Sequence, residues 1–204
     1  MSGIAVGYGK PNPAEVKKML DKEAHRGDYV SGTFSENRVV MMQNYLHADI
    51  GENGRQPEVP ASSPDTDLRI CYDGQLGNAP ELAGELDIDD DALQEEQIVL
   101  GLYEEHGADM FDHLGDGIFA FAISDGDKLM AARDLLGIKT LFYGYRDGQL
   151  CLATELKGLT AVTDDVRAEG RVDAASSALV EMDSSVQSLA QRRGNNQEAV
   201  SMGA

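Results

Sequence analysis

Hydrophobic positions up to Leu159 alternate between the spacing of helices and the spacing of strands. The clearest helix follows Asn12, which is a good N-cap, and Pro13, which suits the first helical position, and its pattern ends at Gly27. Helices are predicted over residues 13–26, 80–86 and 91–106, with one more helical turn over 110–114. Strands are predicted over residues 4–6, 37–49, 68–72, 117–124, 128–133, 140–146 and 149–155.

The last four of these strands follow one another through short turns. Asp125-Gly126 and Asp147-Gly148 separate two of the pairs, and such Asp-Gly pairs are typical of tight hairpins because the turn needs positive φ. The run IFAFAIS is apolar on both faces, as expected for a strand that is covered on both sides. Periodicity alone therefore predicts a mixed α+β domain.

Beyond residue 162 the pattern changes to the spacing of a coiled-coil seam. Apolar or small residues recur at steps of three and four, namely Val172, Ala175, Leu179, Met182, Val186 and Leu189. We therefore predict a helix from Val172 to Arg193. Its serines are poor helix formers, so it needs support, either from its own domain or from a second subunit or protein partner. The chain thus divides into a domain over 1–162 and a linker, helix and tail over 163–204.

Composition changes this picture by excluding several classes of partner. The net charge is −19, from 36 acidic and 17 basic residues, which disfavours nucleic acid and anionic membranes and suits a high-salt cytoplasm. No apolar run is long enough for a membrane span, and the N-terminus lacks the pattern of a secretory signal, so a cytoplasmic location is expected.

The residues that could bind a metal or a cofactor show no recognisable pattern. Cys71 and Cys151 each lie in an apolar strand-like run and are expected to be buried, reduced thiols. The four histidines share no metal-ligand spacing, and no phosphate-binding loop is present. We expect no metal and no cofactor.

Two segments far apart in the sequence carry a family resemblance. The N-terminus Met1-Ser2-Gly3-Ile4 and the block over residues 98–159 resemble the class II glutamine amidotransferases, most closely the glutaminase domain of asparagine synthetase. The shared motifs include an A-R-D-x-x-G-I-K block ending at Lys139 and an S/T-E-x-K-x-L block ending at Leu159. The resemblance implies a four-layer αββα sandwich, with two antiparallel sheets between helix layers, followed here by the C-terminal helix.

The resemblance also implies a catalytic position at Ser2. In the family this residue is a cysteine that becomes the N-terminal nucleophile when Met1 is removed. The α-amino group, with a pKa of about 8, then acts as the base. A serine hydroxyl is far less ionised than a thiol near neutral pH, so Ser2 is a weaker nucleophile.

The resemblance places a glutamine pocket around this residue, and this chain departs from it. The family reads N-G-E where this chain reads Asp73-Gly74-Gln75. Asp73 and Gly74 thus occupy the oxyanion-hole positions, and an ionised Asp73 offers no donor to an oxyanion. Gln75 lacks the charge that would pair with the substrate ammonium.

Two further pocket positions differ in the same way. Asn44 stands where the family has an arginine that clamps the substrate carboxylate, and an amide cannot replace that charged bidentate clamp. Glu95 is the acidic residue that aligns with the family's ammonium-binding aspartate. The sequence therefore predicts a domain that keeps the fold but has lost glutaminase activity and acts as a structural, self-assembling or regulatory subunit. The alternative is an active N-terminal-serine amidohydrolase that acts on a cationic or neutral amide.

Overall fold

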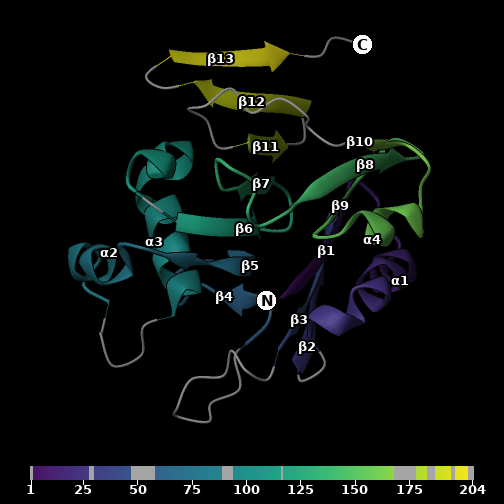
Figure 1. Cartoon of the computed structure of the whole chain (residues 1–204), viewed down its shortest axis with the longest axis horizontal. Coiled ribbons are helices and arrows are strands. Elements are labelled where there is room, and N and C mark those ends of the chain that lie inside the picture. Colours follow the sequence, from purple (N-terminus) through teal and green to yellow (C-terminus); the bar gives the residue numbers. More distant parts are fainter. Residues whose placement is uncertain are drawn as a thin grey trace.

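Two antiparallel β-sheets pack face to face, and each carries helices on its outer side (Figure 1). The computed structural model describes residues 2–27, 30–46, 58–88, 94–115, 117–167, 178–182, 187–193 and 196–201. The six-stranded sheet has the order β10-β8-β9-β1-β3-β2, and the seven-stranded sheet has the order β13-β12-β11-β7-β6-β5-β4. This arrangement confirms the predicted αββα sandwich.

The elements have the following bounds. The strands are β1 (Gly3–Tyr8), β2 (Val30–Glu36), β3 (Val39–Tyr45), β4 (Ala61–Ser62), β5 (Arg69–Leu76), β6 (Gly117–Ser124), β7 (Leu129–Arg133), β8 (Phe142–Arg146), β9 (Gln149–Ala153), β10 (Val166–Arg167), β11 (Ala178–Met182), β12 (Gln187–Arg193) and β13 (Asn196–Ser201). The helices are α1 (Pro13–Lys22), η1 (Ala24–Arg26), α2 (Ala79–Glu85), α3 (Glu95–His106), η4 (Gly107–Asp112) and α4 (Leu156–Thr160).

Strand β1 lies near the centre of the molecule because both of its faces are covered. Ile4 and Val6 point into the layer between the two sheets, where they meet Ala122 and Leu129 of the opposite sheet. Ala5 points outward and packs with residues of α1 and α4. The continuous apolar pattern of this strand follows from burial on both sides, as is usual for an inner layer of such a sandwich.

The sequence predicted α1 and the hairpin strands within a few residues. The Asn12 side chain accepts a hydrogen bond from the Ala14 N–H at 3.0 Å, so it caps the helix as expected. The turn between β8 and β9 has positive φ at both Asp147 (49°) and Gly148 (78°), as this kind of hairpin requires. The strand β2 and the short helix α4 were not predicted.

The predicted helix from Val172 to Arg193 is wrong for the residues that the structure describes there. These residues form β11 and β12, and β11 pairs antiparallel with β7, which places the C-terminal strands in the seven-stranded sheet. Without β11, the outer backbone groups of β7 would have no partner. Ala178, Val180 and Met182 also recur at the strand period of two, so the pattern suited either element. The division of the chain after residue 162 stays a prediction.

The described residues contain neither a membrane-spanning helix nor a disulfide. No helix there is long and apolar enough to cross a membrane. Cys71 and Cys151 are both buried and form no disulfide.

The close approach of Gly27 to β3 gives a test of the packing around η1. A Cβ atom on Gly27 would lie 2.6–2.7 Å from the backbone C, N and O atoms of Tyr45, and backbone cannot move aside. We expect Gly27→Ala to lower the free energy of unfolding by about 2 kcal/mol or more, because of this overpacking. Chemical denaturation measures the change.

Gly84 in α2 is the matched control, since a Cβ atom there meets nothing within 4 Å. Gly84→Ala should leave stability unchanged or raise it by up to about 1 kcal/mol, because alanine favours a helix. Equal losses in the two variants would contradict the packing described here.

Candidate functional site

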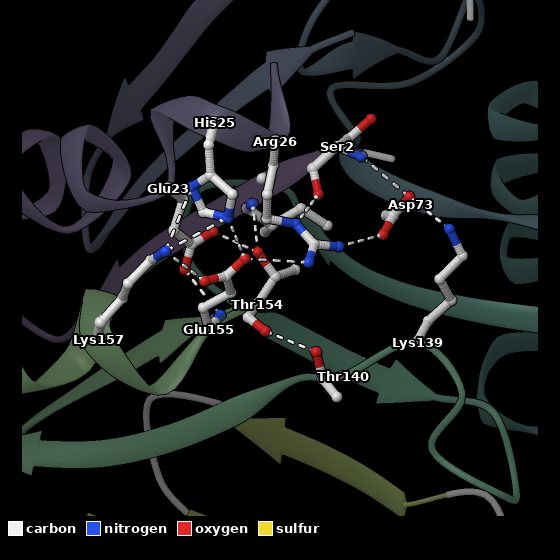
Figure 2. A network of polar contacts seen from close by, with 12 residues as sticks. Ser2, Glu23, His25, Arg26, Asp73, Lys139, Thr140, Thr154, Glu155 and Lys157 are labelled. Carbon is white, nitrogen blue, oxygen red and sulfur yellow. Dashed lines mark hydrogen bonds and ion pairs between the residues drawn. The ribbon is translucent and has the colours of Figure 1, made fainter.

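The site is built around Ser2, which immediately precedes β1 and is 3% exposed. Its backbone nitrogen donates a hydrogen bond to Oδ1 of Asp73 on β5 at 3.0 Å. Its carbonyl oxygen accepts a hydrogen bond from Nε of Arg26, in η1, at 2.9 Å. In Figure 2 the Ser2 side chain points away from the Arg26 guanidinium. The backbone of Ser2 is therefore held on both sides.

Asp73 is a buried carboxylate with two cationic partners. The Lys139 ammonium lies 2.8 Å from Oδ1, and Nη2 of Arg26 lies 2.9 Å from Oδ2. The three side chains are 14%, 11% and 4% exposed for Lys139, Arg26 and Asp73. We call this triad the Asp73 lock (Figure 2). Because water is largely excluded from it, each charge depends on the others for compensation.

Asn44 holds the next residue of the N-terminal strand. Its Oδ1 accepts a hydrogen bond from the Gly3 N–H at 2.6 Å, and its Nδ2 donates to the Glu23 carbonyl at 3.1 Å. A Cβ atom on Gly3 would lie 2.5 Å from Asn44 Oδ1, so the two residues are in close contact. The Asn44 side chain thus joins β3 to β1 and to the end of α1.

Glu23 lies behind the Asp73 lock and binds Thr154, which in turn binds Ile4, the second residue of β1. Its carboxylate accepts hydrogen bonds from the Thr154 hydroxyl and, at 2.8 Å, from the Glu155 N–H. The hydroxyl oxygen of Thr154 in turn accepts a hydrogen bond from the Ile4 N–H at 3.1 Å. Burial raises the pKa of Glu23 to about 7, although these two donors and the nearby Arg26 charge lower it in part.

The other predicted positions lie along β5 and α3. Gly74 follows Asp73 directly, and a Cβ atom on it would come within 2.5 Å of the Tyr72 hydroxyl. Gln75 is exposed. Glu95 accepts hydrogen bonds from the Tyr72 hydroxyl at 2.6 Å and from the Leu76 N–H at 3.0 Å. Burial raises the pKa of Tyr72, so its hydroxyl stays protonated and donates to Glu95.

Reasoning from the sequence missed the cations that complete the site. Arg26 and Lys139 are 47 and 66 positions from Asp73, so no local spacing links them. The sequence did contain one signal for these cations. Asp73 interrupts the apolar run of β5, and a carboxylate that is buried in a strand needs a cationic partner. Glu23 gave no such signal, since it stands among the charged residues at the end of a surface helix.

The site has no feature of a metal centre. Within the described part of the chain, no three His, Cys, Asp or Glu side chains are placed to hold a metal ion.

The chain is similar in sequence to amidotransferases over most of its length. The sequence model of the family described as "Glutamine amidotransferase domain" matches residues 1–192. Asparagine synthetase (glutamine-hydrolyzing) 3 of Bacillus subtilis is 34% identical over 152 residues, which are 72% of this chain and 24% of that protein. Asparagine synthetase (glutamine-hydrolyzing) 1 of Saccharomyces cerevisiae is 30% identical over 165 residues, 78% of this chain and 28% of that protein. The chain thus spans about a quarter of the length of these relatives.

Solved structures with similar folds point the same way. A glutamine phosphoribosylpyrophosphate amidotransferase from B. subtilis, in complex with ADP and GMP, superposes with a TM-score of 0.63 and 15% identity. That match covers 98% of this chain and 49% of the other. The structure described as the allosteric regulatory enzyme of purine biosynthesis gives a TM-score of 0.69, also at 15% identity, over 98% of this chain and 48% of the other. At this identity the likeness concerns the fold alone.

The Asp73 lock predicts a large stability difference between two aspartates. Asp73→Asn keeps the shape and removes the anion, which takes the ion pair from Lys139 and leaves Arg26 with Glu155 alone. We expect a loss of about 3 kcal/mol in the free energy of unfolding. Asp21→Asn is the control, because Asp21 pairs with Lys17 on the surface, where both side chains are more than half exposed. It should change stability by less than about 0.5 kcal/mol. Similar small values for both variants would show that the lock contributes little.

Glu23 predicts a pH dependence whose sign is fixed by the direction of its shift. Because its pKa is raised from 4.5 to about 7, Glu23 adds stability at low pH and loses it as pH rises through 7. Glu23→Gln cannot titrate. The stability of the natural chain relative to this variant should therefore fall by about 2–3 kcal/mol between pH 5 and pH 8.

Denaturation curves across this pH range provide the measurement. Glu81→Gln, at an exposed carboxylate on α2, is the control and should run parallel to the natural chain. A difference between the natural chain and Glu23→Gln that stays constant with pH would contradict the role given to Glu23.

Proposed function

This chain belongs to the class II glutamine amidotransferase family, and we propose that within this family it acts as a structural or regulatory subunit that does not hydrolyse glutamine. One observation carries the proposal. The polar atoms of Asp73, Asn44 and Glu95, three of the positions matching the glutamine pocket, are occupied by hydrogen bonds within the chain. A pocket whose polar groups are used internally has little left to offer a substrate.

Asp73 opposes catalysis in two ways. Both of its oxygens accept hydrogen bonds, so it has no donor for a developing oxyanion, and the loss of one such donor lowers rates by roughly 10²–10³. It also contacts the nitrogen that would become the α-amino base at Ser2. The hydrogen bond to Asp73 at 3.0 Å holds this nitrogen as a donor, whereas a base must accept a proton.

Asn44 and Gln75 oppose substrate binding. The two polar ends of Asn44 bind Gly3 and Glu23, so the side chain cannot turn toward a substrate carboxylate without releasing the N-terminal strand. Gln75 is exposed and uncharged, and gives a substrate ammonium no ion pair. Both charged ends of a free amino acid would therefore lack their partners.

A binding role is left once catalysis is removed. The acidic surface and the two buried free cysteines support a place in the cytoplasm. The expected partner is a second copy of the chain or another protein. The C-terminal segment forms strands where a helix was expected, and β13 is the edge strand of the seven-stranded sheet. We propose that the partner binds this segment along the outer edge of β13.

One observation favours the alternative, an active N-terminal-serine amidohydrolase. Two cations, Arg26 and Lys139, lie beside Ser2 and could stabilise an oxyanion in place of the missing donor. They are, however, both engaged by Asp73, and a substrate would have to compete with that carboxylate. We therefore rank this function second.

A glutaminase assay separates the two functions. We expect the purified chain to release no more glutamate from glutamine than the Ser2→Ala variant does. Ser2→Cys should stay equally inactive, because the stronger nucleophile does not restore the roles lost at Asp73 and Asn44.

The mass of the intact chain shows in the same samples whether Met1 has been removed. Glutamate release that disappears in Ser2→Ala would overturn the proposal and establish the hydrolase. Release by Ser2→Cys alone would show that the pocket still binds glutamine.

A further inference from the structure

Glu23 supports the start of the N-terminal strand through its backbone. Its carbonyl oxygen accepts hydrogen bonds from the Arg26 N–H at 2.9 Å and from Nδ2 of Asn44 at 3.1 Å. Arg26 in turn binds the carbonyl of Ser2, and Asn44 binds the N–H of Gly3. Both residues are therefore held by side chains that Glu23 itself holds.

The carboxyl group of Glu23 supports the next residue, Ile4, through Thr154. The regular pairing between β1 and β9 begins at Ala5 and Ala153. Just beyond that pair, the Ile4 N–H donates to a side chain, the Thr154 hydroxyl, at 3.1 Å, and this hydroxyl donates to the Glu23 carboxylate. The bond that holds Ile4 thus depends on the position of one carboxyl group (Figure 2).

Short helices cover this carboxyl group. Glu23 is 0% exposed, and a Cβ atom on Gly158 of α4 would lie 2.7 Å from its Oε1. The helix η1 has three residues and α4 has five. Helices of this length are not stable by themselves and depend on their packing, so this corner of the molecule can open without the rest of the fold.

The cations nearest to Glu23 are bound to other carboxylates. Arg26, from η1, favours the ionised form of Glu23 but is paired with Asp73 and Glu155. Glu155, at the start of α4, opposes ionisation. Two further basic groups pair with Glu155, namely His25 and Lys157. The groups that reach Glu23 from β3 and β9, an amide and a hydroxyl, are neutral. Burial outweighs the favourable contacts and raises the pKa of Glu23 to about 7.

We propose that Glu23 makes the attachment of the N-terminal strand depend on pH. The strand is held while this carboxyl group is neutral, and it opens locally when the group ionises. An ionised carboxylate is poorly solvated in the closed form, whereas in the open form water reaches it, so ionisation favours opening. The open form lacks the bond between Thr154 and Ile4. The inference deepens the proposed function, since the segment that carries Ser2 then responds to its surroundings, and it rests on that function only for the regulatory role.

Proton linkage gives the sign and the size of the effect. In the open form the hydrated carboxyl group has its ordinary pKa of 4.5 and is almost fully ionised at pH 6, whereas in the closed form it ionises only near pH 7. The closed form therefore loses stability relative to the open form as pH rises through 7. Raising the pH from 6 to 8 should increase the ratio of open to closed molecules about tenfold.

Hydrogen exchange of the backbone amides, followed by NMR, tests the proposal. The Ile4 amide reports on the strand, and the amide of Ile123, buried in the middle of β6, reports on complete unfolding. We expect the protection factor of Ile4 to fall about tenfold between pH 6 and pH 8 and to stay below that of Ile123 at both. In Glu23→Gln, which cannot titrate, the protection of Ile4 should be the same at both pH values. Glu81→Gln, at an exposed carboxylate, is the control and should behave as the natural chain does.

A second variant displaces the carboxyl group without titrating it. In Gly158→Ala the new Cβ atom would lie 2.7 Å from Oε1 of Glu23 and push it away from Thr154. We expect the Ile4 amide of this variant to be no better protected at pH 6 than that of the natural chain at pH 8. Gly84→Ala, where a Cβ atom meets nothing within 4 Å, should leave the protection of Ile4 unchanged.

Three results would overturn the proposal. The first is a protection factor of Ile4 that stays constant between pH 6 and pH 8, or that falls equally in Glu23→Gln. The second is equal protection of Ile4 and Ile123 at both pH values, which would mean that the strand opens only when the whole chain unfolds. The third is an Ile4 amide as well protected in Gly158→Ala as in the natural chain. Each of these leaves the proposed absence of glutaminase activity standing, whereas glutamate release by a chain whose strand opens with pH overturns the proposed function alone.

Discussion

The structure around the N-terminus depends on one buried carboxylate, that of Asp73. It lies on β5 of the seven-stranded sheet, yet it binds the backbone of Ser2 at the start of β1 in the other sheet. Burial of a single anion there would be strongly unfavourable, and Arg26 and Lys139 compensate it from η1 and from the loop after β7. One side chain thus joins both sheets, a helix end and a loop.

Two of the three residues that bind the N-terminal strand stand at positions that, by the resemblance, correspond to the family's glutamine pocket. Asp73, Asn44 and Thr154 hold the successive nitrogens of Ser2, Gly3 and Ile4. Thr154 belongs to a motif shared with the family, while the other two stand at altered positions. Two polar groups that in the family serve the substrate are, in our account, structural bonds here, so the fold can persist without the glutamine site.

The sequence predicted the scaffold better than the connections across it. Apolar periodicity and Asp-Gly turns located the hairpin strands because these signals are local. The ion pairs of Asp73 with Arg26 and Lys139 join residues that only the fold brings together, and so escaped prediction. The prediction for the C-terminal segment was wrong for another reason. Its weak apolar pattern suits a helix or a strand, and pairing with β7 decides between them. The altered pocket positions were visible only through the resemblance, and their internal bonds only in the structure.

We propose that the polar groups at the positions matching the glutamine pocket are occupied by hydrogen bonds within the chain. The most direct test is to titrate the isotopically labelled chain with glutamine and follow the amide signals of Gly3, Gly74 and Gln75. Up to about 10 mM glutamine, well above the usual range of enzyme KM values, the account predicts no saturable shift. A saturable shift at these amides would show that glutamine still enters the site, and would contradict the account.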